Sequence, residues 1–287
     1  MNCKVCGSDL LFLIYEGVSE VNKDDFKITD NRYGLTLPLF RCRKCGFIQS
    51  DSDTLDITKL YTQLEDEEYI TSAPQRRKQF QYLIKQTRNY ITSSAPKILD
   101  IGAGIGLFVK EARAVGWDAE GIEPSVFLSE QARSEGLSVI TGTFPHPECP
   151  GPYDAIFLTD VIEHLQDPAI LVQALPRHLA PDGVVIVVTP NVSSLVAKSM
   201  GKKWWHYRIA HLGYYNKTTL SKLMLCYGFE PVKFTSAKWY FSGDYIITRL
   251  AHYLPFLRSV VNRGRVTRIM VPVNFFDSYV AIFRMKI

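Results

Sequence analysis

Apolar residues follow two different periods along the central part of the chain. Five short runs predict strands, and most of them hold consecutive apolar residues, as buried strands do: 97–101, 118–123, 137–141, 153–159 and 183–189. Three segments between them carry apolar residues three or four positions apart, which is typical of helices with one buried face: 106–116, 125–136 and 167–180. Strands of this type that alternate with helices predict an α/β fold, in which helices cover both faces of a parallel sheet.

The segments that flank this region show the same two periods. Residues 74–91 place apolar side chains on one helical face, and Pro96 separates this helix from the first buried strand. Towards the end of the chain, a helix is expected at 217–229 and strands at 230–236 and 274–287. We therefore expect these segments to extend the same α/β domain.

The N-terminal segment has a different pattern, in which two Cys-x-x-Cys pairs enclose short strand-like runs. Four thiolates complete a tetrahedral shell around Zn²⁺ and leave no open position, which predicts a structural site rather than a catalytic one. A redox pair is the rival interpretation, but two pairs that each continue into glycine favour zinc. The predicted metal ligands are Cys3, Cys6, Cys42 and Cys45. We therefore divide the chain into a zinc ribbon at 1–50, linker and helices at 51–95, and an α/β domain at 96–287.

A glycine-rich turn follows the first buried strand of the α/β domain. Gly102, Gly104 and Gly106 open the next helix, and such a turn binds an adenosine-containing cofactor. The dinucleotide fingerprint requires a third glycine where Leu107 stands, so a pyrophosphate has less reason to bind here. Glu123 ends the second strand, where a carboxylate can accept hydrogen bonds from ribose hydroxyls. The turn alone leaves the cofactor class open.

Five stretches, in this order, resemble the class I S-adenosylmethionine-dependent methyltransferases: "ILDIGAGIG", "GIEPS", "YDAIFLTDVIEHLQDP", "RHLAPDGVVIVVTPN" and "HLGYYNKTTLSKLMLCYGF". The resemblance covers about residues 97–235. It implies a Rossmann-like sheet of seven strands whose last strand is antiparallel, with S-adenosylmethionine at the carboxyl ends of the first strands. An N-terminal zinc ribbon before such a domain is similar to bacterial enzymes that methylate sugars.

The same resemblance implies roles for individual residues. Gly102, Ala103 and Gly104 would line the methionine part of the cofactor, and Glu123 would hold the ribose. The remaining predicted cofactor contacts are Asp100, Gly106, Pro124, Thr143, Asp160 and Val161. Thr143 stands where many relatives carry an acidic adenine contact, so the sequence departs from the family at this position.

The chemistry of methyl transfer requires an aligned acceptor and a group that removes its proton. His164 and Glu163 follow the fourth strand and are the first candidates, with His164 as general base. His211, further along the chain, is the third predicted catalytic residue. The segment 202–215 follows the fifth strand and is rich in aromatic and basic residues. We predict that it forms a wall for an anionic acceptor or packs as a loop; its candidate residues are Trp204, Trp205, His206, Arg208, His211 and Tyr214.

Positive charge is concentrated near the C-terminus. The chain has a formal net charge of +4, but residues 196–287 hold 15 Lys and Arg against 3 Asp and Glu, which gives +12. Residues 245–270 combine arginines with apolar residues at helical spacing, which predicts peripheral contact with a membrane, a core or dimer helix, or a lid. No apolar run is long enough to span a bilayer and no leader peptide is evident, so a cytoplasmic location is expected.

These features predict a methyltransferase that acts on a sugar, nucleotide sugar or glycolipid precursor of a cell-surface polysaccharide. One alternative is an RNA base methyltransferase, against which the net negative charge of residues 1–195 weighs. A second alternative is an isoprenoid quinone or other lipid O-methyltransferase. A third, a non-catalytic cofactor-binding subunit, conflicts with the intact glycines and Glu123.

Overall fold

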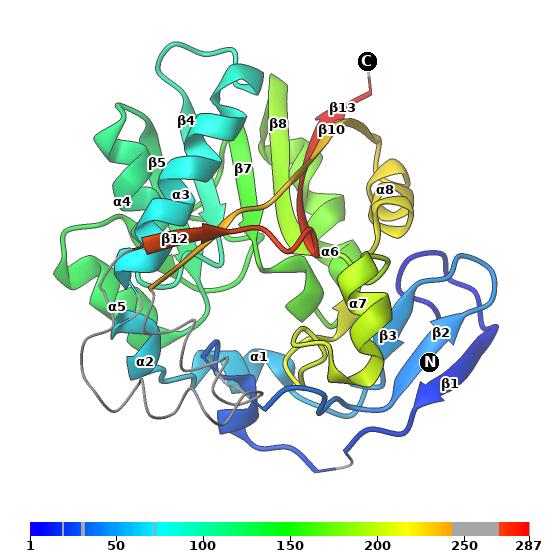
Figure 1. The fold of residues 1–287 in the computed structure, drawn as a ribbon. Helices are drawn as coiled ribbons and strands as arrows, with labels where there is room; N and C mark the ends of the chain where they lie inside the picture. The colour runs from blue at the N-terminus through cyan, green and yellow to red at the C-terminus, as the bar shows by residue number, and fades with distance from the viewer. Residues whose placement is uncertain (19, 30–31, 72, 243–269, 287) are drawn as a thin grey trace.

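The computed structural model describes residues 1–18, 20–29, 32–71, 73–242 and 270–286 (Figure 1). Its centre is a mixed sheet of seven strands in the order β10-β13-β8-β7-β4-β5-β6. The five strands β4 to β8 run parallel, and β13 lies antiparallel between β8 and β10. Their bounds are β4 Lys97–Ile101, β5 Asp118–Glu123, β6 Val139–Thr141, β7 Tyr153–Thr159, β8 Leu179–Pro190, β10 Phe229–Ser236 and β13 Ser278–Met285. The predicted Rossmann-like sheet with an antiparallel last strand is confirmed.

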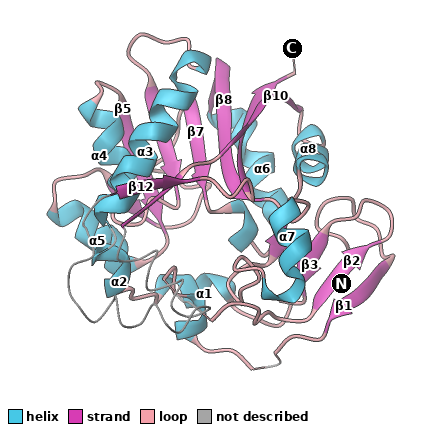
Figure 2. Cartoon of the chain, viewed as in Figure 1, coloured by secondary structure: helices cyan, strands magenta, loops and turns pink. Residues whose placement is uncertain are grey.

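Alternate residues of each strand enter two separate cores, because successive side chains point to opposite faces of a sheet. Ile98 and Phe157 pack beneath α3 (Ala73–Thr87), α4 (Leu107–Ala114) and α5 (Val126–Ser134). Leu99 and Ile156 pack beneath α6 (Pro168–Ala174) and α8 (Lys217–Leu225). Figure 2 shows the two groups of helices flanking the strands. The continuous apolar runs in the sequence reflect this burial on both faces.

Strand β8 is longer than expected. We predicted its start at Gly183, after a turn, but it begins at Leu179. The parallel register with β7 pairs Tyr153 with Leu179 and Ala155 with Val184, so the extra residues are taken up as an irregularity within the strand.

The cysteine segment belongs to a second sheet, in the order β1-β2-β3-β9. The first three strands, β1 (Leu11–Tyr15), β2 (Leu39–Cys42) and β3 (Ile48–Ser50), come from the N-terminal segment. The fourth, β9 (Gly213–Tyr214), comes from the predicted aromatic wall and pairs antiparallel with β3. The division of the chain at residue 50 remains a prediction, and this sheet joins segments from both sides of it.

The remaining elements are shorter. They are η1 (Lys23–Phe26), α1 (Ile57–Thr62), α2 (Glu67–Thr71), η2 (Arg88–Tyr90), η3 (Ile162–His164), η4 (Leu175–His178), α7 (Leu195–Met200), η5 (Gly201–Lys203), and the antiparallel pair β11 (Trp239–Ser242) and β12 (Met270–Val273). The predicted helical segment at 245–270 lies almost wholly outside the described residues. Its membrane, dimer and lid interpretations therefore stay predictions.

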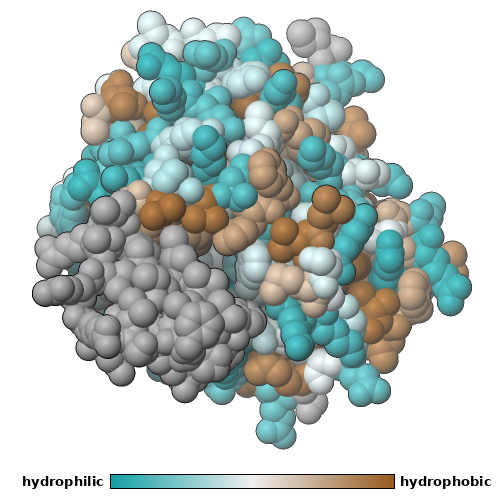
Figure 3. Space-filling view, viewed as in Figure 1, coloured by the Kyte–Doolittle hydropathy of each residue, from teal (hydrophilic) through white to brown (hydrophobic). Residues whose placement is uncertain are grey.

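On the face shown in Figure 3, the described surface is mostly hydrophilic, and apolar residues gather near its middle. Leu195, Phe275 and Phe276 are large apolar residues with exposed side chains. Within the described residues, no helix has both the length and the hydrophobicity needed to cross a membrane.

Candidate cofactor and acceptor site

The glycine turn between β4 and α4 is fixed to the end of β5. The Gly102 and Ala103 N–H groups both donate to the Ile122 carbonyl oxygen, at 2.8 and 3.1 Å. Gly102 and Gly104 have φ of 75° and 54°, in the left-handed region that favours glycine. A Cβ at Gly102 would lie 2.6 Å from Val161 Cγ2, and one at Gly104 would lie 2.7 Å from the Tyr69 hydroxyl oxygen. The turn therefore needs glycine at both positions, for its backbone and for its close neighbours.

Glu123 is held against this turn by two backbone N–H groups. Its carboxylate accepts from Gly104 N at 2.8 Å and from Ser125 N at 2.9 Å. Burial raises the pKa of Glu123 to about 7, although the two N–H donors work in the opposite direction. The glycine turn and the carboxylate predicted to hold the ribose are thus in direct contact.

Two further carboxyl groups lie near the turn. Burial and the Glu123 charge raise the pKa of Asp100 well above its ordinary value. Burial raises the pKa of Asp160 to about 6, while the charges of Arg76, His206 and Arg208 oppose this shift. Asp160 also has φ of 55°, an uncommon conformation for a residue other than glycine and one that is frequent at functional sites. Three partly or fully buried carboxyl groups suit a ligand that brings positive charge and hydroxyl donors, and S-adenosylmethionine has both.

The other predicted cofactor residues take different positions. Gly106 is the N-cap of α4, and a Cβ there would lie 2.7 Å from the Leu137 side chain, so this glycine serves helix packing. Pro124 is half-buried directly after Glu123. Thr143 is exposed, one residue beyond Gly142, whose N–H donates to the Glu123 carbonyl oxygen at 2.9 Å.

Two residues near the turn were not predicted from the sequence. Tyr69 of α2 is buried over Gly104, and the Arg76 guanidinium of α3 lies 4.2 Å from the centre of its ring. Burial raises the pKa of Tyr69 to about 12, with smaller contributions from Arg76 and from the carboxyl groups of the site. Both residues come from the segment that we predicted only as linker and helices. No local motif marks them, because their partner is a turn about 30 residues further along the chain.

His164 lies in η3, directly after β7. Its Nδ1 is 2.9 Å from the Ala210 carbonyl oxygen and 2.7 Å from the Tyr61 hydroxyl oxygen. A carbonyl oxygen only accepts, so in the tautomer that makes the Ala210 bond Nδ1 carries the hydrogen, the Tyr61 hydroxyl is not a donor to Nδ1, and Nε2 is the basic nitrogen. Burial and the Arg208 charge lower the pKa of His164 to about 3, so the ring is neutral at physiological pH. Tyr61, from α1, was not predicted.

Glu163 and His211 are buried beside His164. The rings of His164 and His211 meet edge to face with centres 4.7 Å apart. Glu163 accepts a hydrogen bond from the Thr189 hydroxyl at 2.9 Å, while its Oε1 and the His211 Nδ1 are buried without a partner among the described residues. The ligand atoms of these three residues lie within 4.8 Å of one another and could hold a cation. The structure thus brings the three predicted catalytic residues together.

The predicted aromatic wall has a largely structural interior. The Trp204 indole is fully buried and donates to Asp277 at 3.2 Å, and His206 Nε2 lies 3.4 Å from the same carboxylate. Arg208 donates to the Ile28 and Lys27 carbonyl oxygens at 3.0 and 2.7 Å. The packing interpretation therefore holds for Trp204. Arg208 fixes the wall to residues 27 and 28 through hydrogen bonds, and its charge acts on His164 and Asp160.

The four predicted metal ligands form a compact cluster. Cys3 and Cys45 have Sγ atoms 3.5 Å apart, Cys6 and Cys42 have them 3.6 Å apart, and all four lie within 4.8 Å. Zinc–sulfur bonds of about 2.3 Å in a tetrahedron require sulfur atoms about 3.8 Å apart, so the cluster fits Zn²⁺. Burial raises the pKa of Cys42, but N–H groups of Cys45 and Lys44 and neighbouring thiols lower it to about 7.

Comparison with known proteins gives the same class for the α/β region. Ubiquinone biosynthesis O-methyltransferases from Methylococcus capsulatus and a Caulobacter species are 33% and 29% identical to this chain over 105 and 103 residues. These alignments cover 34% and 33% of this chain and 44% and 41% of the relatives, so the chain spans less than half the length of either. A SAM-dependent methyltransferase from Archaeoglobus fulgidus shares the fold, with a TM-score of 0.52 and 16% identity over 76% of this chain and all of that protein.

The match to a known family extends further along the chain. Residues 74–233 match the family described as a methyltransferase domain, and this range covers more than half of the 287 residues. The range begins within α3 and ends within β10, so it contains the glycine turn, Glu123 and the Glu163–His164 pair. The chain therefore belongs to the methyltransferase domain family.

Proposed function

We propose that the protein transfers a methyl group from S-adenosylmethionine to a hydroxyl group of a small acceptor. The observation that carries this proposal is the contact between the glycine turn and Glu123. Each Glu123 carboxylate oxygen accepts one backbone N–H and keeps a lone pair that can accept from a ribose hydroxyl. Asp160, whose pKa is raised only to about 6, adds negative charge near the same turn at neutral pH. The cofactor, when bound, supplies an electrophilic methyl group, and the protein has to bind, orient and deprotonate the acceptor.

His164 is the residue that we propose as proton acceptor. Its Nδ1–H is fixed by the Ala210 carbonyl oxygen, which leaves Nε2 to receive the proton of the acceptor hydroxyl. The low pKa of His164 keeps the ring neutral but makes Nε2 a weak base, so proton transfer depends on how strongly the site stabilises the acceptor oxygen as it becomes negative. The nearby Arg208 charge that lowers this pKa also favours an acceptor oxygen that becomes negative.

The acceptor class that we propose is an isoprenoid quinone precursor or a similar hydroxylated lipid. This choice is supported by the names of the relatives, which are ubiquinone biosynthesis O-methyltransferases. It was the second alternative from the sequence, and it now stands ahead of the sugar acceptor. A sugar or nucleotide sugar remains the second candidate. The four-cysteine module lies outside the matched residues 74–233, and this module is the feature that resembles the sugar-methylating enzymes.

An acceptor screen separates these candidates. The purified chain is incubated with methyl-labelled S-adenosylmethionine and a short-chain polyprenyl catechol, a set of nucleotide sugars, or RNA. We expect label in the catechol, as a product with an added methyl ether. Label in a nucleotide sugar and none in the catechol would overturn the quinone assignment while keeping methyl transfer.

For the cysteine cluster we propose one structural Zn²⁺ held by Cys3, Cys6, Cys42 and Cys45. Support comes from the sulfur–sulfur distances and from the number of thiolates, because four thiolates complete the tetrahedral shell of a structural zinc site. Atomic absorption is expected to give one zinc per chain, and replacement of Cys42 by serine is expected to reduce it. A metal content that is unchanged in that variant would contradict this assignment.

A further inference from the structure

The cysteine module shares its sheet with the segment that carries the proposed acceptor residues. β3 pairs with β9 through Ile48 opposite Tyr214 and Gln49 opposite Gly213. The Ser50 N–H continues this ladder and donates to the Leu212 carbonyl oxygen at 2.8 Å. The wall residue His211 therefore stands next to the point where this segment joins the N-terminal sheet.

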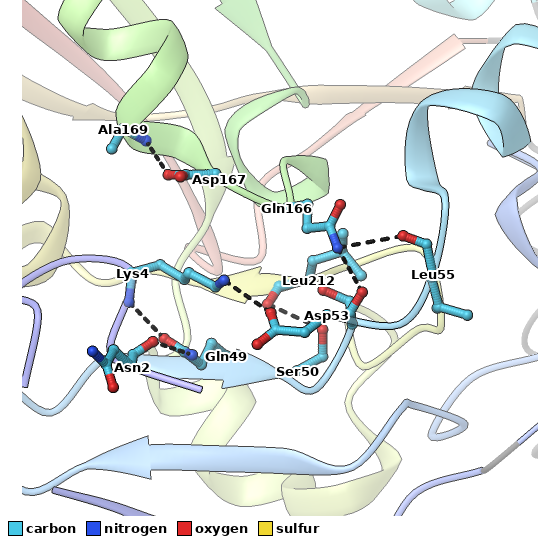
Figure 4. Close-up of polar contacts among 11 residues, drawn as sticks. Asn2, Lys4, Gln49, Ser50, Asp53, Leu55, Gln166, Asp167, Ala169 and Leu212 are labelled. Atoms are coloured by element: carbon cyan, nitrogen blue, oxygen red, sulfur yellow. Dashed lines mark hydrogen bonds and ion pairs between the residues drawn. The ribbon is translucent and has the colours of Figure 1, made fainter. Parts of the chain in front are cut away.

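From Leu212 the contacts continue to the turn that carries His164. The Leu212 N–H donates to the Glu163 carbonyl oxygen at 2.7 Å. Gln166, just beyond η3, donates from Nε2 to the Ser52 carbonyl oxygen at 2.6 Å. Figure 4 shows Gln166 near the Ser50–Leu212 contact. The η3 segment is thus bonded to Leu212, which pairs with Ser50 of β3, and Gln166 is bonded to the backbone that directly follows β3.

The cysteines themselves reach the same network. The side-chain amide of Gln49 accepts from Lys4 N at 2.8 Å and donates to the Asn2 carbonyl oxygen at 3.0 Å, which fixes the Cys3 loop to β3 (Figure 4). Cys3 and Cys42 lie in the same buried cluster as Phe47 and Tyr215, whose ring centres are 4.8 Å apart. Four thiols at this spacing hold their loops together only when a cation offsets their charge once they ionise.

The cofactor side has its own anchors. The glycine turn is bonded to β5, and Glu123 is bonded to Gly104 and Ser125. None of these bonds involves residues 1–50. The N-terminal module therefore meets the acceptor half through a continuous ladder. It reaches the cofactor half at one remove, through Thr29, which donates to the Asp66 carboxylate that also accepts from Tyr69 N.

We propose that metal loading of the four-cysteine cluster positions the acceptor half of the site, namely residues 208–215 and η3, and leaves the cofactor half in place. This inference rests on the proposed zinc site and on the proposed acceptor role of His164. The cysteine residues act here as positioning residues, because they reach the reacting groups only through β3 and β9.

The test removes the metal and measures the two halves separately. Wild-type protein is treated with a chelator, and hydrogen exchange is followed at the amides of residues 208–215 and 102–104. We expect exchange protection of 208–215 to fall about tenfold or more, while that of 102–104 is kept. The affinity for S-adenosylmethionine, measured by calorimetry, should change by less than about threefold. Unchanged protection of 208–215 would overturn the proposal, whatever the enzyme methylates.

A pair of variants covers the case in which the metal-free chain fails to fold. A Cβ at Gly213 would lie 3.1 Å from the Phe47 and Tyr215 rings, so Gly213→Val separates β9 from β3 without touching a cysteine. This variant should keep its zinc and its S-adenosylmethionine affinity but lose protection at 208–215 and raise the acceptor KM. Cys226→Ser, at an exposed free cysteine, is the matched thiol control and should change none of these. A Gly213→Val protein with wild-type protection and wild-type KM would contradict the proposal.

Discussion

At the scale of single residues, Glu123 links the cofactor site to pH. Its ordinary pKa of 4.5 rises to about 7 in the folded chain, so the carboxyl is largely protonated at pH 6 and largely ionised at pH 8. Ribose hydroxyls donate best to the ionised form. The proposed site should therefore bind S-adenosylmethionine about tenfold more tightly at pH 8 than at pH 6 and level off above that, as one pKa near 7 requires.

Calorimetry at several pH values checks this expectation. Asp160, with a pKa raised to about 6, acts in the same direction over a lower pH range. In Glu123→Gln the affinity should be lower at pH 8 by about tenfold, the value of one lost charge-assisted hydrogen bond, and nearly independent of pH between 7 and 8. If the wild-type affinity for S-adenosylmethionine fell as the pH rose, the proposed role of ionised Glu123 would be wrong.

His164 supplies a second prediction at this scale. His164→Gln keeps an amide near the Ala210 carbonyl oxygen but removes the basic Nε2. Methyl transfer should fall by about 10²-fold or more, the usual contribution of a general base, while S-adenosylmethionine affinity stays within about twofold. Tyr61→Phe removes only the second Nδ1 contact and should have a smaller effect. Steady-state kinetics with calorimetry would reject the base role if both variants transfer at the wild-type rate.

At the scale of elements, two glycines that flank α4 can be compared by substitution: Gly104 in the turn before it and Gly116 after it. Gly104 and Gly116 both have positive φ, of 54° and 88°, so alanine at either costs about 1–2 kcal/mol in backbone strain. Only at Gly104 would the new Cβ meet a neighbour, the Tyr69 hydroxyl, whereas Gly116 has nothing within 4 Å. Denaturant unfolding should show a loss of stability in both variants, larger in Gly104→Ala because of the contact with Tyr69, and only Gly104→Ala should weaken S-adenosylmethionine binding. Equal affinities would mean that the turn does not contact the cofactor.

Elements that depend on nearby residues were predictable from the sequence. β4, β5 and β7 match their predicted bounds because their apolar runs are buried on both faces. The turn after β4 was marked by its glycines. β9 was not predictable, because two residues, Gly213 and Tyr214, become a strand only through pairing with Ile48 and Gln49 far earlier in the chain.

At the scale of the whole molecule, the same distinction applies to the site. Asp100 and Glu123 stand on predictable strand ends, and the structure places them at one turn. Tyr61, Tyr69 and Arg76 come from a segment without a motif, and only the folded chain brings them over the site. The chain also places the cysteine module against the acceptor half, so a boundary drawn at residue 50 separates parts that share one sheet.

The central claim is that the glycine turn and Glu123 hold a methyl donor rather than a dinucleotide. Calorimetric titration of the full chain at pH 8 with S-adenosylmethionine, and separately with NAD, tests it most directly. We predict one S-adenosylmethionine per chain, displaced by S-adenosylhomocysteine and weakened in Glu123→Gln, and no heat with NAD. Saturable NAD binding with no response to S-adenosylmethionine would contradict the account.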